Sequence, residues 1–218
     1  MGHIVSNFIK RLECNLKKEL PGRKSQNKMA PARIRESNPP GNTGKAGVLI
    51  LIFPRKGELS TLLIKRTEYP GPHSGQISLP GGKTEETDKS QIITAIRETG
   101  EETGIDTRKI TVLGTLTPLY IPVSNLEVLP VVGYTDSQPE FRIDSKEVEY
   151  LIHIPLQHLG ENKLKKEKKL EINGSTIIAP GYEINNEFVW GATAMILSEF
   201  IDVASKTCTT DYSKEMFE

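Results

Sequence analysis

The sequence predicts one α/β domain, a layered α/β/α sandwich on a mixed sheet, preceded by an N-terminal amphipathic helix and a polar arm. Strand-like segments stand on both sides of one helix in the middle of the chain, and a second helix closes the domain. This order favours an α/β/α sandwich over repeated parallel βαβ units. A chain of 218 residues is long enough to bury one substantial core.

The chain begins with a segment that we expect to form an amphipathic helix. Ile4, Phe8, Leu12 and Leu16 recur every four residues, and a proline-glycine pair at 21–22 ends the segment. Lysines and arginines on its polar side suit an anionic membrane surface. Docking on the body of the protein or on a second subunit is the preferred expectation, so a homodimer is a possible assembly.

Residues 23–45 are polar, contain several prolines and glycines, and are predicted to form an irregular arm. The segment holds five cations before its first acid, at Arg23, Lys24, Lys28, Arg33 and Arg35. These cations can contact a phosphate of a ligand or can belong to a solvated linker. The predicted organisation is a helix and basic arm over 1–45, the α/β domain over 46–206, and a tail over 207–218.

The α/β domain is predicted to contain strands rich in β-branched and aliphatic residues. The expected strands cover 47–53, 59–65, 76–79, 110–120, 127–135 and 148–154. One further hairpin is expected from 163–172 and 176–179, turning at Asn173-Gly174, and another over 183–190. A helix over 191–205 carries an apolar stripe and closes the domain.

The helix in the middle of the chain carries three carboxylates on one side. At about 100° per residue, Glu102 lies about 40° to one side of Glu98, and Glu101 about 60° to the other. We expect the carboxylates to face solvent or a cleft. The opposite arc, which is predicted to press against the core, holds Ile92, Ile93, Ile96 and Gly100.

Both ends of this helix carry sequence signals. Asp88 and Gln91 fit a capping box, and Gly104 before an isoleucine fits a left-handed glycine stop, so the predicted helix runs from Lys89 to Thr103. Asp88 either caps the helix or takes part in the site, and both roles stay open. A glycine on the predicted buried face, at position 100, indicates that a neighbouring backbone approaches there.

The three carboxylates favour a divalent-metal site. Arg97 supplies one positive charge beside them, and the helix is entered from a proline-glycine-glycine turn at 80–82. Hard divalent cations require several oxygen ligands, which three glutamates can provide. The alternative is a solvated acidic face, which is what most glutamate pairs at this spacing form.

Residues 82–105 resemble the Nudix box, in which a glycine, five residues, a glutamate and seven residues precede R-E-U-x-E-E-x-G-U, with U aliphatic. Residues 97–105 match the second half, except that Thr99 replaces the aliphatic residue. Asp88 stands where the box has its first glutamate. Eight residues, rather than seven, separate Asp88 from Arg97.

The inserted residue resembles the coenzyme A diphosphatase branch of the Nudix hydrolases. That branch has a stretch like L-L-x-x-R-S-x-x-L-R-x-H-x-G-Q-V-x-F-P-G-G before the box, and residues 62–82 are similar to it. Pro70 and Gly71 depart from the pattern, since the branch has leucine and arginine there. The missing arginine removes a cation for a substrate phosphate, for which Lys65 or Arg66 can substitute.

The resemblance implies a Mg²⁺- or Mn²⁺-dependent hydrolase with a nucleotide-type substrate. Coenzyme A or acyl-coenzyme A would be cleaved at its diphosphate, giving 4′-phosphopantetheine or its acyl form and adenosine 3′,5′-bisphosphate. Glu98 and Glu102 would hold the metal, Glu101 would complete its shell directly or through water, and Arg97 would orient these glutamates. The expected substrate-binding residues are Gly81, Gly82, Arg66, His73 and Gln76. The general base stays open among Glu98, Glu101, Glu147 and Glu149.

Two alternatives keep the fold. One changes the substrate to ADP-ribose or another nucleoside diphosphate derivative, which the missing arginine at Gly71 favours. The other is a non-catalytic nucleotide-binding module, for which the longer spacing and the substituted Asp88 and Thr99 would be signs of decay. The intact glutamates speak against the second.

Composition narrows the partners and the compartment. The formal net charge is zero, so no global field favours nucleic acid or an anionic membrane. The sequence shows neither a secretory signal nor an apolar run long enough to span a bilayer. Cys14 and Cys208 lack metal-ligand spacing. We therefore expect a reduced, cytoplasmic protein with no nucleic-acid or membrane partner.

Overall fold

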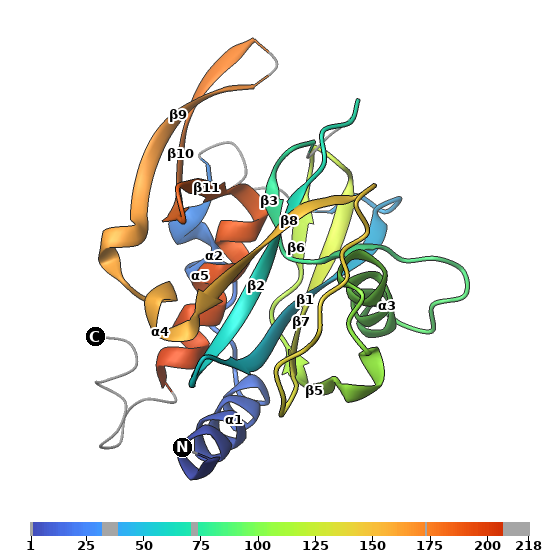
Figure 1. The fold of residues 1–218 in the computed structure, drawn as a ribbon. Coiled ribbons are helices and arrows are strands. Elements are labelled where there is room, and N and C mark those ends of the chain that lie inside the picture. Colours follow the sequence, from blue (N-terminus) through green and yellow to red (C-terminus); the bar gives the residue numbers. More distant parts are fainter. Residues whose placement is uncertain (1, 32–38, 71–73, 173, 207–218) are drawn as a thin grey trace.

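The computed structural model describes residues 2–31, 39–70, 74–172 and 174–206 (Figure 1). His73, Arg33, Arg35, Gly71 and Cys208 lie outside these residues, so the expectations that concern them stay predictions. The side chains of residues 2–4 and of Ile172 and Ser175 are likewise not described.

A mixed eight-stranded sheet forms the centre of the molecule. Strand β1 (Gly44–Arg55) pairs antiparallel with β2 (Glu58–Arg66) and parallel with β7 (Leu126–Tyr134). The strand order is β3-β2-β1-β7-β5, with β4 on β1, β6 on β7 and β8 on β2. The remaining strands are β3 (Ile77–Ser78), β4 (Gly81–Lys83), β5 (Thr111–Thr115), β6 (Leu119–Ile121) and β8 (Val148–Pro155).

Strand β1 is buried on both faces, as a continuous apolar run predicts for a central strand. Ile50 and Ile52 belong to one hydrophobic cluster, and Leu49, Leu51 and Phe53 belong to the other. The period-2 alternation of a strand therefore gives β1 a side chain for each layer.

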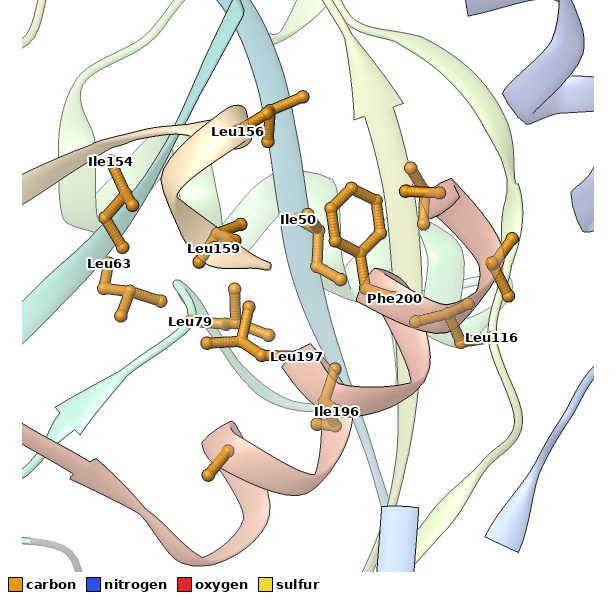
Figure 2. Packing of buried hydrophobic residues seen from close by; sticks show 14 of the residues in the cluster. Ile50, Leu63, Leu79, Leu116, Ile154, Leu156, Leu159, Ile196, Leu197 and Phe200 are labelled. Carbon is orange, nitrogen blue, oxygen red and sulfur yellow. The ribbon is translucent and has the colours of Figure 1, made fainter. Parts of the chain in front are cut away.

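Helices cover both faces of the sheet, which confirms the α/β/α sandwich (Figure 1). Helix α3 (Gln91–Thr103) lies on the face of the smaller cluster. Helix α5 (Gly191–Ser205) and the short α4 (Leu156–Leu159) lie on the other face, where Phe200 and Leu197 pack near Ile50 (Figure 2). These elements are linked by short 3₁₀ segments at Asn27–Met29, Thr107–Lys109 and Asn162–Leu164.

The N-terminal helix docks on the body of the protein, as preferred from the sequence. Helix α1 spans Gly2–Leu16 and places Phe8, Leu12 and Leu16 in the same cluster as α5. Leu12 is completely buried. Residues before 45 therefore share the core of the α/β domain.

The prediction of an irregular arm is wrong at its start. Residues Arg23–Gln26 form helix α2, and Gln26 is buried against α5. The carboxylate of Glu199, fully buried in α5, accepts hydrogen bonds from Gly22 N at 3.1 Å and Gln26 Nε2 at 2.9 Å. The Glu199 carboxylate thus ties the start of the polar segment to α5, because polar groups in the interior need hydrogen-bond partners. Lys28 pairs with Asp202 of α5 at 2.6 Å.

Two strand predictions needed correction. The segment 110–120 is two strands, because Pro118 interrupts it between β5 and β6. A second, three-stranded sheet has the order β11-β10-β9. Here β10 (Ser175–Ile184) continues through Pro180, which is tolerated because β11 (Glu187–Trp190) ends opposite Gly181. The third strand, β9 (Lys165–Ile172), forms the outer edge of this sheet.

Among the described residues, every helix is too short or too polar to cross a bilayer.

Candidate active site

Helix α3 begins two residues later than predicted and ends where predicted. Ser90 is the N-cap, and its side chain accepts a hydrogen bond from Ile93 N, so the Asp88-Gln91 capping box is wrong. The Gln91 amide instead donates to Ala46 O at 2.8 Å and to Glu127 O at 3.1 Å, across β1 and β7. Gly104 is the left-handed C-cap, with φ of 70°.

The buried face of α3 agrees with the prediction at Ile92, which packs against the core, and differs from it at Ile93. Ile93 is 46% exposed, whereas Ala95 is completely buried. The reason is the close approach of β1, where a Cβ at Gly47 would lie 2.1 Å from Gln91 O. Small side chains fit best where two backbones lie this close, so Thr94 and Ala95 are buried there. The buried face holds Thr94, Ala95, Thr99, Glu102 and Thr103.

Glu102 is consequently buried, contrary to the prediction that all three carboxylates face outward. Only 1% of the residue is exposed. Its Oε1 accepts from Arg66 Nη1 at 3.0 Å, and its Oε2 accepts from Gly81 N at 2.8 Å. The end of β2 and the glycine loop therefore meet at this carboxylate. In this arrangement the amide of Gly81 binds Glu102, and Arg66 is paired with the same acid.

Glu98 lies against the second glycine of the loop. A Cβ at Gly82 would stand 2.4 to 2.6 Å from the three atoms of the Glu98 carboxyl group. A side chain at position 82 would therefore displace this carboxylate. Gly81 has φ of 146°, and a Cβ there would meet the backbone of β1. The two glycines bring α3 and the strands close enough for Glu98 and Glu102 to lie beside one loop.

Arg97 joins the remaining acids into one network. Its Nη2 lies 2.9 Å from Asp88 Oδ2 and 3.0 Å from Glu98 Oε1, and its Nη1 lies 2.9 Å from Glu101 Oε2. Asp88 also accepts from Glu85 N and Thr94 Oγ1. Asp88 is thus a partner of Arg97 and not the helix cap, while its predicted role in the site stays a prediction. The guanidinium of Arg97 holds the pKa of Asp88 well below its usual range.

Glu101 differs from the other two box glutamates. Its side chain is 60% exposed, and its described ion pair is with Arg97. Glu98 and Glu102 therefore form the inner pair, and Glu101 lies on the outer side of the same helical turn.

The inner pair is held in an environment that disfavours negative charge. Burial, opposed by the Gly81 amide and Arg66 and helped by the nearby charges of Glu98 and Glu147, raises the pKa of Glu102 to about 7. Burial also raises the pKa of Glu98, with Glu101 and Glu147 acting in the same direction. Glu147 lies far along the chain, before β8, yet its charge acts on both acids.

The chemistry of these side chains fits a hard divalent cation, although they are not assembled as a complete shell. Within the described ranges, no group of three acids, histidines or cysteines is close enough to hold a metal ion as it stands. Glu98 and Glu102 nevertheless supply carboxylate oxygens, the ligands that Mg²⁺ and Mn²⁺ prefer. Burial is the main cause of their raised pKa values and nearby acids add to it, so a bound cation would favour the ionised forms of both carboxylates.

Other predicted site residues are placed near this pair or remain undescribed. The backbone of Gln76 joins the site, since Arg66 N donates to Gln76 O at 3.0 Å. The sequence analysis did not identify Gly47, the position where β1 approaches α3. The sequence marks it only as a glycine near the start of a strongly apolar strand. Thr99, the departure from the box, is buried and donates its hydroxyl to Ala95 O at 2.6 Å.

Comparison with known proteins identifies the family of this chain. Residues 44–172 match the NUDIX domain family. Nudix hydrolase 22, chloroplastic, of Arabidopsis thaliana is 34% identical over 179 residues, which cover 79% of this chain and 57% of that protein. An uncharacterized Nudix hydrolase NudL of Yersinia pestis is 36% identical over 157 residues, 70% of this chain and 76% of the relative.

The plant relatives are longer, so this chain spans just over half of their length. Among solved structures, a MutT/nudix family protein from Enterococcus faecalis aligns with a TM-score of 0.46 and 19% identity, over 78% of this chain and 64% of that one. The family match covers more than half of the chain, and relatives above 30% identity cover more than two thirds of it. The chain therefore belongs to the Nudix hydrolase family.

Proposed function

We propose that this protein is a divalent-cation-dependent pyrophosphohydrolase that cleaves coenzyme A or acyl-coenzyme A at the diphosphate. The products would be 4′-phosphopantetheine, or its acyl form, and adenosine 3′,5′-bisphosphate. The observation that carries the proposal is the convergence of Glu98 and Glu102 on the loop of Gly81 and Gly82. Family membership supports the hydrolytic chemistry, because Nudix hydrolases generally use divalent metal ions.

The choice of coenzyme A rests on the stretch that leads into the site. Residues 62–82 resemble the coenzyme A diphosphatase branch. Of these, 62–66 lie in β2, 77–78 form β3 and 81–82 begin β4, and Arg66, Gly81 and Gly82 lie beside the inner glutamates. Eight residues between Asp88 and Arg97, the branch-like spacing, still allow Arg97 Nε to reach Asp88 Oδ1 at 3.1 Å.

The chain's own residues have distinct tasks in this scheme. Glu98 and Glu102 hold the cation, with Glu101 joining from the outer side of the turn. Arg97 keeps Glu98 and Glu101 oriented through its ion pairs. Arg66 is 22% exposed at its side chain, so it can exchange Glu102 for a substrate phosphate once a cation neutralises that acid. His73 and Gln76 stay candidate substrate contacts.

When bound, the cation would offset charge on the diphosphate and make an attacking water more acidic. The residue that accepts the proton is open among the four glutamates considered from the sequence. Glu147 acts electrostatically on the inner pair, whereas the nearby charge of Glu149 acts on the hydroxyl of Tyr150.

Product analysis tests the proposal. Purified protein with Mg²⁺ would be given coenzyme A, ADP-ribose and nucleoside triphosphates, and the products resolved by mass. We expect adenosine 3′,5′-bisphosphate from coenzyme A, and its loss in Glu102→Gln. The matched control is Glu167→Gln, which makes the same charge change on the exposed strand β9.

Each outcome has a distinct meaning. If AMP forms from ADP-ribose and no bisphosphate forms from coenzyme A, the protein is a hydrolase of ADP-ribose and the proposed substrate is wrong. Release that persists in Glu102→Gln would refute the site. No hydrolysis of any compound would favour the non-catalytic binding module.

A further inference from the structure

Strand β2 ends in two consecutive cations, Lys65 and Arg66, of which the second binds Glu102. Neighbouring residues of a strand place their side chains on opposite faces of the sheet. Ile64 alternates with Arg66 and belongs to the cluster on the α3 side. Leu63 alternates with Lys65 and belongs to the cluster on the α5 side. The end of β2 therefore presents one cation to the inner glutamates and another toward α5 and the second sheet.

A bulge separates these two cations in the pairing of β2 with β8. Lys65 pairs with Tyr150, but Arg66 pairs with Val148, so the register leaves Glu149 over. Bulges increase the local twist, redirect the side chains beside them and are frequent next to active sites. A ligand bound at Arg66 can thus extend around the twisted end of β2 to Lys65.

Lys65 shares an acidic partner with Tyr150. Its Nζ lies 3.5 Å from Oε2 of Glu187, at the start of β11. The hydroxyl of Tyr150 donates to Oε1 of the same carboxylate at 2.5 Å. This hydrogen bond raises the pKa of Tyr150 to about 12, so the hydroxyl keeps its proton at neutral pH. The three side chains form a cluster that joins β2, β8 and β11.

The two contacts of Glu187 differ in strength. A distance of 2.5 Å between a hydroxyl and a carboxylate oxygen marks a strong hydrogen bond, whereas 3.5 Å is longer than a usual N–H···O bond. Lys65 can therefore turn to another anion while Glu187 keeps Tyr150 as its donor. The side chain of Lys65 is 21% exposed, so a ligand can reach it from solvent.

The chemistry of Lys65 suits a phosphate group. An ammonium group offers three donors on a flexible stem and binds phosphate as a point charge. A phosphomonoester carries about 1.5 to 2 negative charges at neutral pH, more than the single charge of Glu187, so it competes well for the lysine.

We propose that Lys65 binds a phosphomonoester that the substrate carries in addition to its diphosphate, and that it thereby determines specificity. In coenzyme A this group is the 3′-phosphate, which leaves with adenosine 3′,5′-bisphosphate. The inference rests on the proposed function, because it assigns a contact to that substrate. It also supplies a phosphate-binding cation to a chain in which Gly71 stands in place of an arginine.

Two nucleotides that differ only in this phosphate test the inference without hydrolysis. Isothermal titration calorimetry would compare adenosine 3′,5′-bisphosphate with AMP on wild type, Lys65→Met and Lys17→Met. Lys17 is the matched control because it also pairs with a glutamate, Glu13 of α1, at 2.7 Å. We expect wild type and Lys17→Met to prefer the bisphosphate about 10-fold, the effect of one hydrogen bond between charged groups. Lys65→Met should lose most of this preference, and Lys65→Arg should keep most of it.

Glu187→Gln provides a prediction of the opposite sign. Glutamine still offers Tyr150 an acceptor, but it removes the charge that competes for Lys65. The preference for the bisphosphate should therefore rise by about 2-fold to 5-fold, the range of a partly exposed ion pair. If the cluster only tied the two sheets together, this variant and Lys65→Met would change the binding of both nucleotides alike.

Failure of the inference is distinguishable from failure of the proposed function. If folded Lys65→Met keeps the wild-type preference, or if wild type shows none, Lys65 does not bind the extra phosphate, whatever the product assay gives. If the preference depends on Lys65 but coenzyme A is not hydrolysed, the phosphate contact stands and the proposed reaction is wrong. Thermal unfolding shows whether each variant is folded. Should Lys65→Met be unfolded, Glu187→Gln decides, and a preference that does not rise contradicts the inference.

Discussion

At the scale of single residues, Glu102 makes stability depend on pH in a defined direction. Its pKa is raised from 4.5 in the unfolded chain to about 7 in the folded protein. The folded state therefore holds a proton that the unfolded state has lost, so stability is fully present below about pH 4.5 and falls as pH rises through 7. The difference is on the order of 3 kcal/mol.

Denaturant unfolding of metal-free protein between pH 5 and pH 8 checks this dependence. We expect the free energy of unfolding to fall over that range in wild type, and to fall less in Glu102→Gln. Mg²⁺ should restore stability at pH 8, because it binds the ionised carboxylates of the folded state only. An identical slope in both proteins would show that Glu102 is not the titrating group.

Gly82 tests the placement of Glu98 by sterics alone. Gly82→Ala inserts a Cβ at the position of the Glu98 carboxyl group, and we expect hydrolysis to fall about 100-fold, as for an active-site misplacement near 1 Å. Gly41→Ala is the control, since a Cβ there meets nothing within 4 Å. Equal activity of both variants would mean that Glu98 does not need its position against the loop.

At the scale of elements, the sequence was informative about where α3 lies and misleading about its orientation. Gly104 marked its end correctly, because a left-handed cap is a local requirement. Its buried face was mispredicted in part: Ile92 packs against the core as expected, but Ile93 is exposed, and β1 approaches the helix at Gly47 beside Ala95 instead. That approach is a tertiary fact, which periodicity does not contain. For the same reason the burial of Glu102 was not predicted.

The orientation of α3 predicts effects of different size on stability for two nearby substitutions. Ile93→Ala removes a half-exposed side chain and should change the free energy of unfolding by less than about 1 kcal/mol. Ala95→Leu forces extra volume against β1 and should destabilise by about 1 to 3 kcal/mol. Chemical denaturation measures both. A larger cost for Ile93→Ala would restore the face predicted from the sequence.

At the scale of the whole molecule, the N-terminal residues are part of the core that supports the site. Leu12 is fully buried among residues of the cluster that also holds Ile50 and Phe200. Buried acids such as Glu199 hold the following segment, and no local sequence pattern announces that contact. The layered sandwich was predictable from the order of strand-like and helical segments, whereas the contact of this segment with Glu199 depends on the distant helix α5.

Leu12→Ala should therefore destabilise the entire domain by about 2 to 5 kcal/mol. Lys10→Ala, on the exposed side of the same helix, should change stability by less than about 0.5 kcal/mol. Thermal unfolding followed by circular dichroism distinguishes the two. If Leu12→Ala left the main transition unchanged, α1 would be an independent appendage.

The central claim is that Glu98 and Glu102 hold a divalent cation beside the glycine loop. Crystals soaked in Mn²⁺ test it most directly, through anomalous diffraction. The account predicts an anomalous peak within coordination distance of both carboxylates. A map with no peak there, and with both acids still paired to Arg97 and Arg66, would contradict it.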